Sequence, residues 1–285
     1  MHFRPGRVHF SFFLSLLVAC APVPDVGGDM WQVIDRPEFQ ERVFFPRASH
    51  SAPPAFADDH RIEVATGVSL GARLHFFDPA FRTVLAFHGN GETVPDYDDI
   101  APAFRSIGLN LFVVDYRGYG WSDGSPGFRT YHEDSKAVSA YFLGLIADRQ
   151  PAAPRPLVFG RSLGSHPATL IATDNPAAYA GLILESGFAD IVPLLSLLGV
   201  DPGPHAEELR RIFSNDRRLS GTNIPVLILH GELDQLIPAS HARDNHRAAS
   251  NSTLALLPGV GHNDVLRQAD LYFKSIRQFV QTLPQ

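Results

Sequence analysis

The chain has 285 residues, of which 45% are hydrophobic and 19% are charged, a composition typical of a folded globular protein. It carries 24 basic and 30 acidic residues, a formal net charge of −6, with no basic cluster, which argues against binding to a nucleic-acid backbone. It contains one cysteine, so neither an internal disulfide nor a cysteine-based zinc site can form.

The N-terminal segment predicts a secretory signal. Arg4 and Arg7 precede an uncharged apolar stretch, Val8 to Ala19, which is too short to span a bilayer but typical of a signal-peptide core. The stretch ends in Leu-Val-Ala-Cys, which resembles the lipobox of bacterial lipoproteins. This resemblance implies a signal peptide over 1–19 and lipidation of Cys20, and hence a lipid anchor to the membrane on the periplasmic side of the bacterial cell envelope. An ordinary secretory signal with a cysteine near the cleavage site is the alternative.

Residues 20–54 are rich in proline, glycine and polar residues, which predicts a tether leading into a domain over 55–285. In that domain short apolar runs alternate with longer amphipathic stretches, a pattern of strands and helices. The predicted strands cover residues 61–65, 70–77, 84–88, 110–115, 156–159, 181–185, 225–230 and 253–257. The predicted helices cover residues 96–107, 131–148, 163–173, 239–249 and 265–283.

This alternation predicts an α/β fold with a mostly parallel sheet of about eight strands and helices on both faces. The near-continuous apolar strands indicate a sheet that is buried on both sides, and we expect only the first pair to be antiparallel. A short cap is predicted at about 190–222, with an apolar part over 191–200 and a charged helix near 205–219. The apolar part could line an acyl pocket or simply pack onto the core. Ligands of such sheets bind beyond the carboxyl ends of the strands.

The candidate nucleophile is Ser162, in the run Gly160-Arg-Ser-Leu-Gly164. The run follows a predicted strand and opens a predicted helix, which is the setting of a nucleophile elbow. Glycines at both ends allow strand and helix to cross closely. The amino end of the new helix also favours negative charge that develops at the serine.

A serine hydroxyl needs a base, and His262 is the best placed of the 13 histidines. It follows the last strand on a glycine-rich loop that can reach over the sheet. It is also the last histidine, in agreement with the chain order Ser, acid, His of this type of hydrolase. His88 and His230 stand at strand ends and are expected to be packing and turn residues.

The acid is expected after the strand that ends at His230, where Glu232 and Asp234 are available. Asp234 is favoured because it directly precedes the Leu-Ile-Pro run that opens the next helix. Its role would be to hold the tautomer of His262 and to stabilise the imidazolium. Backbone N–H groups of Leu163, which follows the nucleophile, and of Asn90, in the His-Gly-Asn-Gly-Glu loop, are the predicted oxyanion hole.

These runs together resemble the α/β-hydrolase-domain serine hydrolases, in particular the branch of protein depalmitoylases and related bacterial membrane-associated hydrolases. The resemblance covers roughly residue 41 to the C-terminus, and it implies the α/β-hydrolase fold and the same roles for Ser162, Asp234 and His262. The animal depalmitoylases carry a cysteine-rich N-terminus, whereas this chain has one cysteine, so the resemblance implies the reaction class alone. The run from Asp115 to Gly124 is a further marker of the family, and we expect its glycines to shape a loop without a catalytic role.

The sequence therefore predicts a serine hydrolase that cleaves a small-molecule carboxylic ester or thioester through an acyl-serine intermediate. We expect no cofactor, no metal ion and no nucleic-acid partner. Two alternatives stay open, a serine peptidase or amidase on the same fold and a catalytically inactive envelope lipoprotein.

Overall fold

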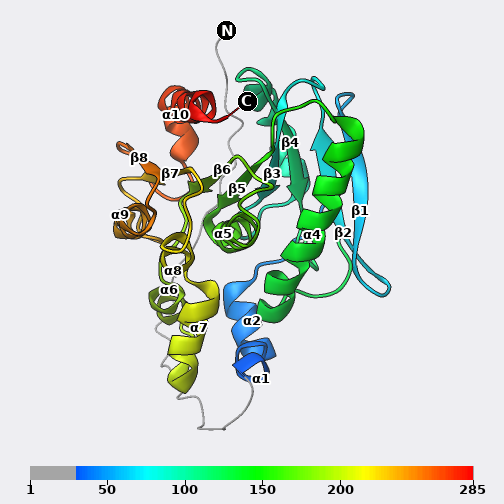
Figure 1. Cartoon of the computed structure of the whole chain (residues 1–285). Helices are drawn as coiled ribbons and strands as arrows, with labels where there is room; N and C mark the ends of the chain where they lie inside the picture. The colour runs from blue at the N-terminus through cyan, green and yellow to red at the C-terminus, as the bar shows by residue number, and fades with distance from the viewer. Residues whose placement is uncertain (1–29, 285) are drawn as a thin grey trace.

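A computed structural model describes residues 30–284. Eight strands form one sheet in the order β1-β2-β4-β3-β5-β6-β7-β8 (Figure 1). β2 pairs antiparallel with both β1 and β4, and the other neighbours are parallel, so the predicted mostly parallel sheet is confirmed with one more antiparallel pair than expected. The strands are β1 Ala57–Ala65, β2 Val68–His75, β3 Arg82–Phe87, β4 Leu109–Val114, β5 Leu157–Arg161, β6 Gly181–Glu185, β7 Val226–Gly231 and β8 Ser252–Leu257.

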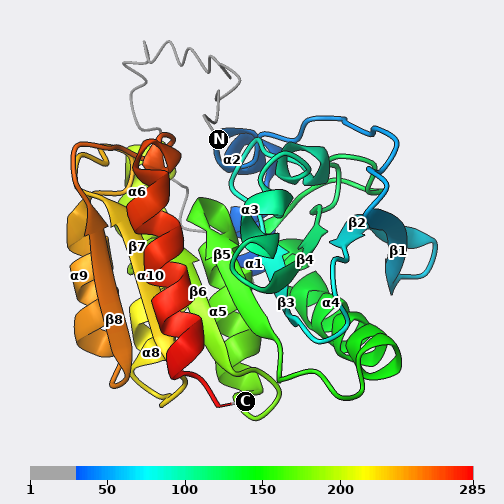
Figure 2. The same ribbon diagram turned by 90° about the horizontal axis from the view of Figure 1, so that it is seen from above.

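Helices cover both faces of the sheet: α4, α5 and α9 lie on one side, and α3 and α10 on the other (Figure 2). The α-helices are α1 Met30–Ile34, α2 Pro37–Val43, α3 Ala101–Arg105, α4 Phe128–Arg149, α5 Ser165–Asp174, α6 Ile191–Leu197, α7 Ala206–Phe213, α8 Asn215–Leu219, α9 Ala239–Ala248 and α10 Ala269–Thr282. Short 3-10 helices are η1 Val94–Tyr97, η2 Ser162–Gly164, η3 Gly203–His205 and η4 Val265–Gln268. Within residues 30–284, no helix has the length and apolar character needed to cross a bilayer.

The two faces of the sheet carry separate hydrophobic cores, because successive side chains of a strand point to opposite sides. In β3, Leu85 and Phe87 belong to the core under α4 and α5, whereas Val84 and Ala86 belong to the core under α3 and α10. All four are almost completely buried. This explains why the strand reads as a continuous apolar run rather than as an alternating one.

The helix predicted over 96–107 is instead two short pieces, η1 and α3. The carboxylate of Asp96 accepts a hydrogen bond from the backbone N–H of Thr93, and the Thr93 side chain completes a capping box at the start of η1. Pro102 stands in the first turn of α3, the part of a helix where the missing N–H of proline is tolerated.

The tether expected over 20–54 is wrong for residues 30–44, which belong to the folded domain. Residues 30–43 form α1 and α2, and Met30, Ile34 and Phe44 are buried in the core under α4 and the cap. The indole ring of Trp31 packs edge-on against Phe213 of α7, with ring centroids 5.9 Å apart. The predicted signal peptide, the predicted lipidation site at Cys20 and the first ten residues of the expected tether lie outside the described residues.

The cap between β6 and β7 consists of α6, η3, α7 and α8. The charged helix expected near 205–219 is interrupted at Ser214, whose backbone is extended. Ile191 and Leu195 of α6 are buried in the core, while Leu197 is 59% exposed. The apolar part of the cap was expected either to line an acyl pocket or to pack onto the core. Ile191 and Leu195 pack onto the core.

Candidate active site

Ser162 lies in the sharp turn between β5 and α5, and its φ of +51° is in the left-handed region that non-glycine residues seldom adopt. A Cβ atom at Gly160 would come within 2.4 Å of the carbonyl oxygen of Gly164, and one at Gly164 within 2.1 Å of that of Phe87. Both glycines are thus required by the close approach of the elbow to its own helix and to β3. The turn presents the serine at the carboxyl edge of the sheet.

His262 joins Ser162 and Asp234 in one hydrogen-bonded chain. The hydroxyl of Ser162 lies 2.7 Å from Nε2 of His262, so it can donate its proton to that nitrogen. Nδ1 of His262 lies 2.7 Å from Oδ2 of Asp234, to which it donates in the matching tautomer. The three residues are 5% to 9% exposed. Strands β5, β7 and β8 therefore bring together three side chains that the sequence places up to 100 residues apart.

Asp234 is held as an ionised acceptor. Its Oδ1 accepts hydrogen bonds from the backbone N–H groups of Leu236 at 3.0 Å and Ile237 at 2.8 Å. Burial alone would raise the pKa of this carboxyl, but hydrogen bonds from His230 and His262 outweigh burial and hold the pKa well below its ordinary value. Glu232, the other acid of this loop, is exposed at the surface.

The two residues predicted for the oxyanion hole come from different segments, the turn after β5 and the loop after β3. Leu163 follows Ser162 at the start of the helical turn. In the part of the chain that the structure describes, no acceptor is found for the backbone N–H of Asn90. The side chain of Asn90 is engaged elsewhere: Nδ2 donates to the carbonyl of Val43 at 2.6 Å, and Oδ1 accepts from Phe45 N–H at 2.9 Å. The segment expected to be a tether thus holds the loop that carries a candidate oxyanion donor.

The glycine-rich run 115–124 forms a loop beside this site, as its composition indicates. Gly118, Gly120 and Gly124 all have positive φ. A Cβ atom at Gly120 would come within 1.8 Å of the carboxylate of Asp115. That carboxylate accepts from the backbone N–H of Val94 at 3.0 Å, so the loop braces the start of η1.

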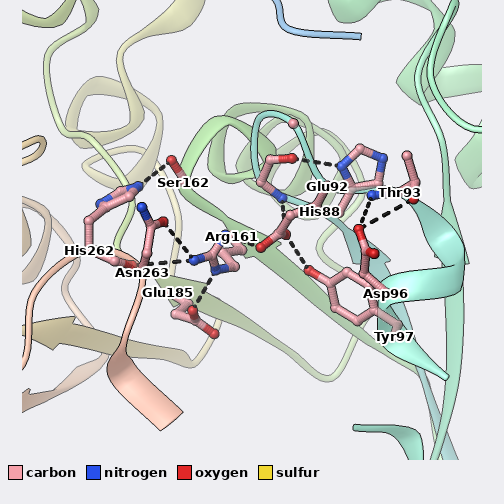
Figure 3. A network of polar contacts seen from close by, with 12 residues as sticks. His88, Glu92, Thr93, Asp96, Tyr97, Arg161, Ser162, Glu185, His262 and Asn263 are labelled. Carbon is pink, nitrogen blue, oxygen red and sulfur yellow. Dashed lines mark hydrogen bonds and ion pairs between the residues drawn. The ribbon is translucent and has the colours of Figure 1, made fainter. Parts of the chain in front are cut away.

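Arg161, between the first glycine and the nucleophile, was not singled out by the sequence. Its guanidinium forms ion pairs with Glu185, at 2.9 Å, and with Glu92 (Figure 3). Burial would lower the pKa of Arg161, but the two carboxylates outweigh burial and raise it. No local sequence pattern indicates this cluster of Arg161, Glu92 and Glu185, because its three members follow or end three different strands.

A cavity of about 170 Å³ lies beside this cluster. Apolar side chains from η1, α3, β5 and η4 line it, together with Arg161 and its two carboxylates. None of the described cap residues contributes to its lining. In the described part of the chain, no group of three His, Cys, Asp or Glu side chains is arranged to hold a metal ion.

Comparison with known proteins identifies the family. The Hydrolase_4 family model, described as serine aminopeptidase S33, matches residues 78–215. An uncharacterized protein of Mycobacterium tuberculosis is 30% identical over 251 residues, which cover 84% of this chain and 85% of that protein. The α/β-hydrolase domain-containing protein WAV2 of Arabidopsis thaliana is 27% identical and covers 85% of this chain and 88% of its own.

Solved structures agree on the fold. An esterase of Pyrococcus furiosus superposes with a TM-score of 0.66 at 17% sequence identity, covering 85% of this chain and 99% of the esterase. At that identity the likeness concerns the fold, while the relatives in sequence identify the family. The chain therefore belongs to the α/β-hydrolase family and is a hydrolase.

Proposed function

We propose that the protein cleaves a carboxylic ester or thioester of a small-molecule substrate through an acyl-serine intermediate on Ser162. The observation that carries the proposal is the continuous chain of 2.7 Å contacts from Ser162 Oγ through His262 to Asp234. The strained backbone of Ser162 supports it, because strain of this kind is concentrated at functional sites. Esterases among the solved structures with this fold are consistent with the same chemistry.

In the first half-reaction, Oγ of Ser162 attacks the carbonyl carbon while its proton passes to Nε2 of His262. Backbone N–H groups of Leu163 and Asn90 stabilise the oxyanion of the tetrahedral intermediate. The intermediate collapses when the bond to the alcohol or thiol breaks and His262 returns the proton to this leaving group. An acyl group then remains on Ser162.

In the second half-reaction, His262 takes a proton from a water molecule that attacks the acyl carbon. A second tetrahedral intermediate collapses with return of the proton to Ser162 Oγ, and the free acid leaves. Asp234 stays ionised throughout, orients the ring of His262 and stabilises its charged form.

Labelling with a fluorophosphonate probe, together with turnover of p-nitrophenyl esters and acyl thioesters of graded chain length, tests this proposal. Ser162→Ala should lose both labelling and turnover while remaining folded. Ser186→Ala is a matched control, because Ser186 is also a buried serine with positive φ, 50°, at the end of a strand. Turnover that survives in Ser162→Ala would remove this serine from the mechanism.

A peptidase is the second candidate, and the description of the matching family model as a serine aminopeptidase favours it. The same acyl-serine chemistry would act on an amide, with an amine as the leaving group. Aminoacyl p-nitroanilides beside the matched p-nitrophenyl esters distinguish the two. Turnover of the anilides at rates comparable with the esters would support the peptidase.

We also propose that the protein is anchored to the bacterial envelope through a lipid on Cys20. The lipobox-like run before this cysteine supports the proposal. Metabolic labelling with a radioactive or alkyne fatty acid should mark the wild type and not Cys20→Ser. Label that persists in Cys20→Ser would contradict the anchor without affecting the proposed reaction.

A further inference from the structure

Among the described side chains, that of Arg161 alone hydrogen-bonds both to Glu92, in the loop after β3, and to the loop that carries His262. Its side chain is 13% exposed, and it donates four hydrogen bonds to protein acceptors. Nε donates to Glu185 at 2.9 Å and Nη1 to Glu92. Nη2 donates to the backbone carbonyl of His262 at 3.3 Å and to Oδ1 of Asn263 at 3.2 Å (Figure 3).

Glu92 extends this network to the loop of the proposed oxyanion hole. One oxygen of its carboxylate pairs with Arg161, and the other accepts a hydrogen bond from the backbone N–H of Gly89 at 2.7 Å. Gly89 directly precedes Asn90. Burial would raise the pKa of Glu92, but Arg161 outweighs burial and lowers it, so the carboxylate remains charged and keeps both contacts. The position of the Asn90 backbone thus depends on the Arg161–Glu92 pair.

Glu185 extends the network to α10. Its second oxygen accepts a hydrogen bond from the hydroxyl of Tyr272 at 2.6 Å. Glu185 faces Arg161 across the β5–β6 ladder, where the two residues are paired in register. Glu185 thereby holds the guanidinium of Arg161 against the sheet. The backbone of Arg161 directly precedes that of Ser162.

We infer that Arg161 is a positioning residue, which sets His262 and the Gly89–Asn90 backbone at their working distances from Ser162. It stands next to the nucleophile and contacts the backbone of the base directly, so a shift of its head group would move both loops relative to the hydroxyl. This inference rests on the proposed acyl-serine mechanism. Its physical basis is that misplacing catalytic groups by about 1 Å can cost a hundredfold in rate.

A planar guanidinium is necessary for this role. Its N–H donors form a rigid planar fork, so that Nε and Nη1 each meet one carboxylate while Nη2 still reaches His262 and Asn263. A lysine would supply the charge that Glu92 and Glu185 require, but not the fixed set of directions. Because all three guanidinium nitrogens of Arg161 already donate to protein acceptors, contacts within the protein account for an arginine at this position beside the cavity.

Arg161→Lys tests the inference, with kcat and KM measured on a short p-nitrophenyl ester that the wild type turns over. We expect kcat to fall by about 10- to 100-fold with KM changed by less than about threefold, because the groups that act on the bound ester are displaced. Arg117→Lys is the matched control. Arg117 is similarly buried and forms a two-point ion pair with Asp134, at 2.7 Å for both contacts, and among the described residues its guanidinium has no hydrogen bond to the proposed triad or to the partners of Arg161. It should keep the wild-type kcat.

Asn263→Ala keeps the charges of the network and serves if Arg161→Lys does not fold. It should lower kcat by a smaller factor, again without a matching change in KM. Hydrogen–deuterium exchange of peptides covering 258–266 should rise in both variants, and this readout does not require activity. Wild-type kcat in a folded Arg161→Lys, or in Asn263→Ala with unchanged exchange, would overturn the inference. A wild type that neither labels nor turns over any ester would instead contradict the proposed function.

Discussion

His230 and His262 share one oxygen atom of Asp234. Nδ1 of His262 lies 2.7 Å from Oδ2 of this carboxylate, and Nε2 of His230 lies 3.2 Å from the same atom. Nε2 of His230 also lies 2.7 Å from the carbonyl of Ile237, to which it can donate. His230, expected from the sequence to be a packing and turn residue, therefore also helps to fix the acid of the proposed triad.

Asp234→Asn should lower kcat by about a thousand- to ten-thousandfold, because the amide can no longer orient and stabilise a charged His262. In this variant, the free energy of unfolding should also fall less steeply as the pH is lowered into the acid range. The pKa of Asp234 is lowered in the folded state, so its stabilisation is present above the ordinary pKa of an aspartate and is lost as the pH falls further. Urea unfolding between about pH 5 and pH 3 should therefore show a shallower decline in the variant.

Glu232→Gln, two residues away in the same loop and exposed, is the control for this experiment. It should keep both the wild-type activity and the wild-type decline in stability. A decline in Asp234→Asn as steep as in the wild type would mean that other carboxylates dominate acid unfolding.

Ser162→Gly should be more stable than Ser162→Ala by about 1 kcal/mol, because glycine adopts positive φ without the steric cost that a Cβ carries. Both variants should lose probe labelling, so the two differ in stability while sharing the loss of activity. Thermal unfolding of the two purified variants measures the difference. Equal melting temperatures would show that the elbow stores no strain at this residue.

His132 should make the protein less stable in mild acid. Burial, together with the nearby positive charges of Arg218 and Lys136, lowers the pKa of His132 to about 4. The unfolded chain then binds more protons than the folded one between about pH 6.5 and pH 4, so the free energy of unfolding falls as the pH is lowered through this range and levels off below it. His132→Gln should reduce that fall, as measured by urea unfolding at several pH values.

His166 contributes to the same range, because burial and the neighbouring His132 hold its pKa well below its ordinary value. The reduction in His132→Gln should therefore be partial. A fall equal to that of the wild type in this variant would show that His132 carries no share of it.

Arg73→Met should destabilise the fold by about 3–5 kcal/mol, because it leaves two carboxylates without their buried partner. Arg73 is completely buried and donates to Asp59 and Asp98, at 2.6 Å in each case. Arg61→Met is the surface control, since Arg61 pairs with Asp123 and both side chains are more than 40% exposed. It should cost less than about 1 kcal/mol in urea unfolding. Similar losses in the two variants would contradict the importance of burial.

The strands and the elbow could be predicted because their signals are local. A short apolar run that ends in Gly-x-Ser-x-Gly predicts a strand, a sharp turn and a helix from adjacent residues alone. The structure places Ser162 at that turn. His262 and Asp234 could be selected because chain order and strand ends restrict the choice. The structure brings both into hydrogen-bonding distance, while their catalytic roles stay predictions.

The N-terminal helices and the hydrogen-bond network of Arg161 could not be predicted, because contacts with segments distant in the sequence stabilise them. Helices of five and seven residues, such as α1 and α2, do not form by propensity alone, and their apolar residues are visible as core only when α4 and α7 lie beside them. Arg161 occupies a variable position of its motif. Its partners come from three other segments of the chain, so nothing near it in the sequence marks it.

The position of β8 at the sheet edge has a consequence for biosynthesis. His262 follows this last strand, and it is 100 residues away from Ser162. In the proposed mechanism, a nascent chain has no base until residue 262 has left the ribosome and β8 has docked on β7. Under the proposed mechanism, the chain therefore stays inert toward esters during its synthesis, and it becomes active only when β7 and β8 complete the sheet.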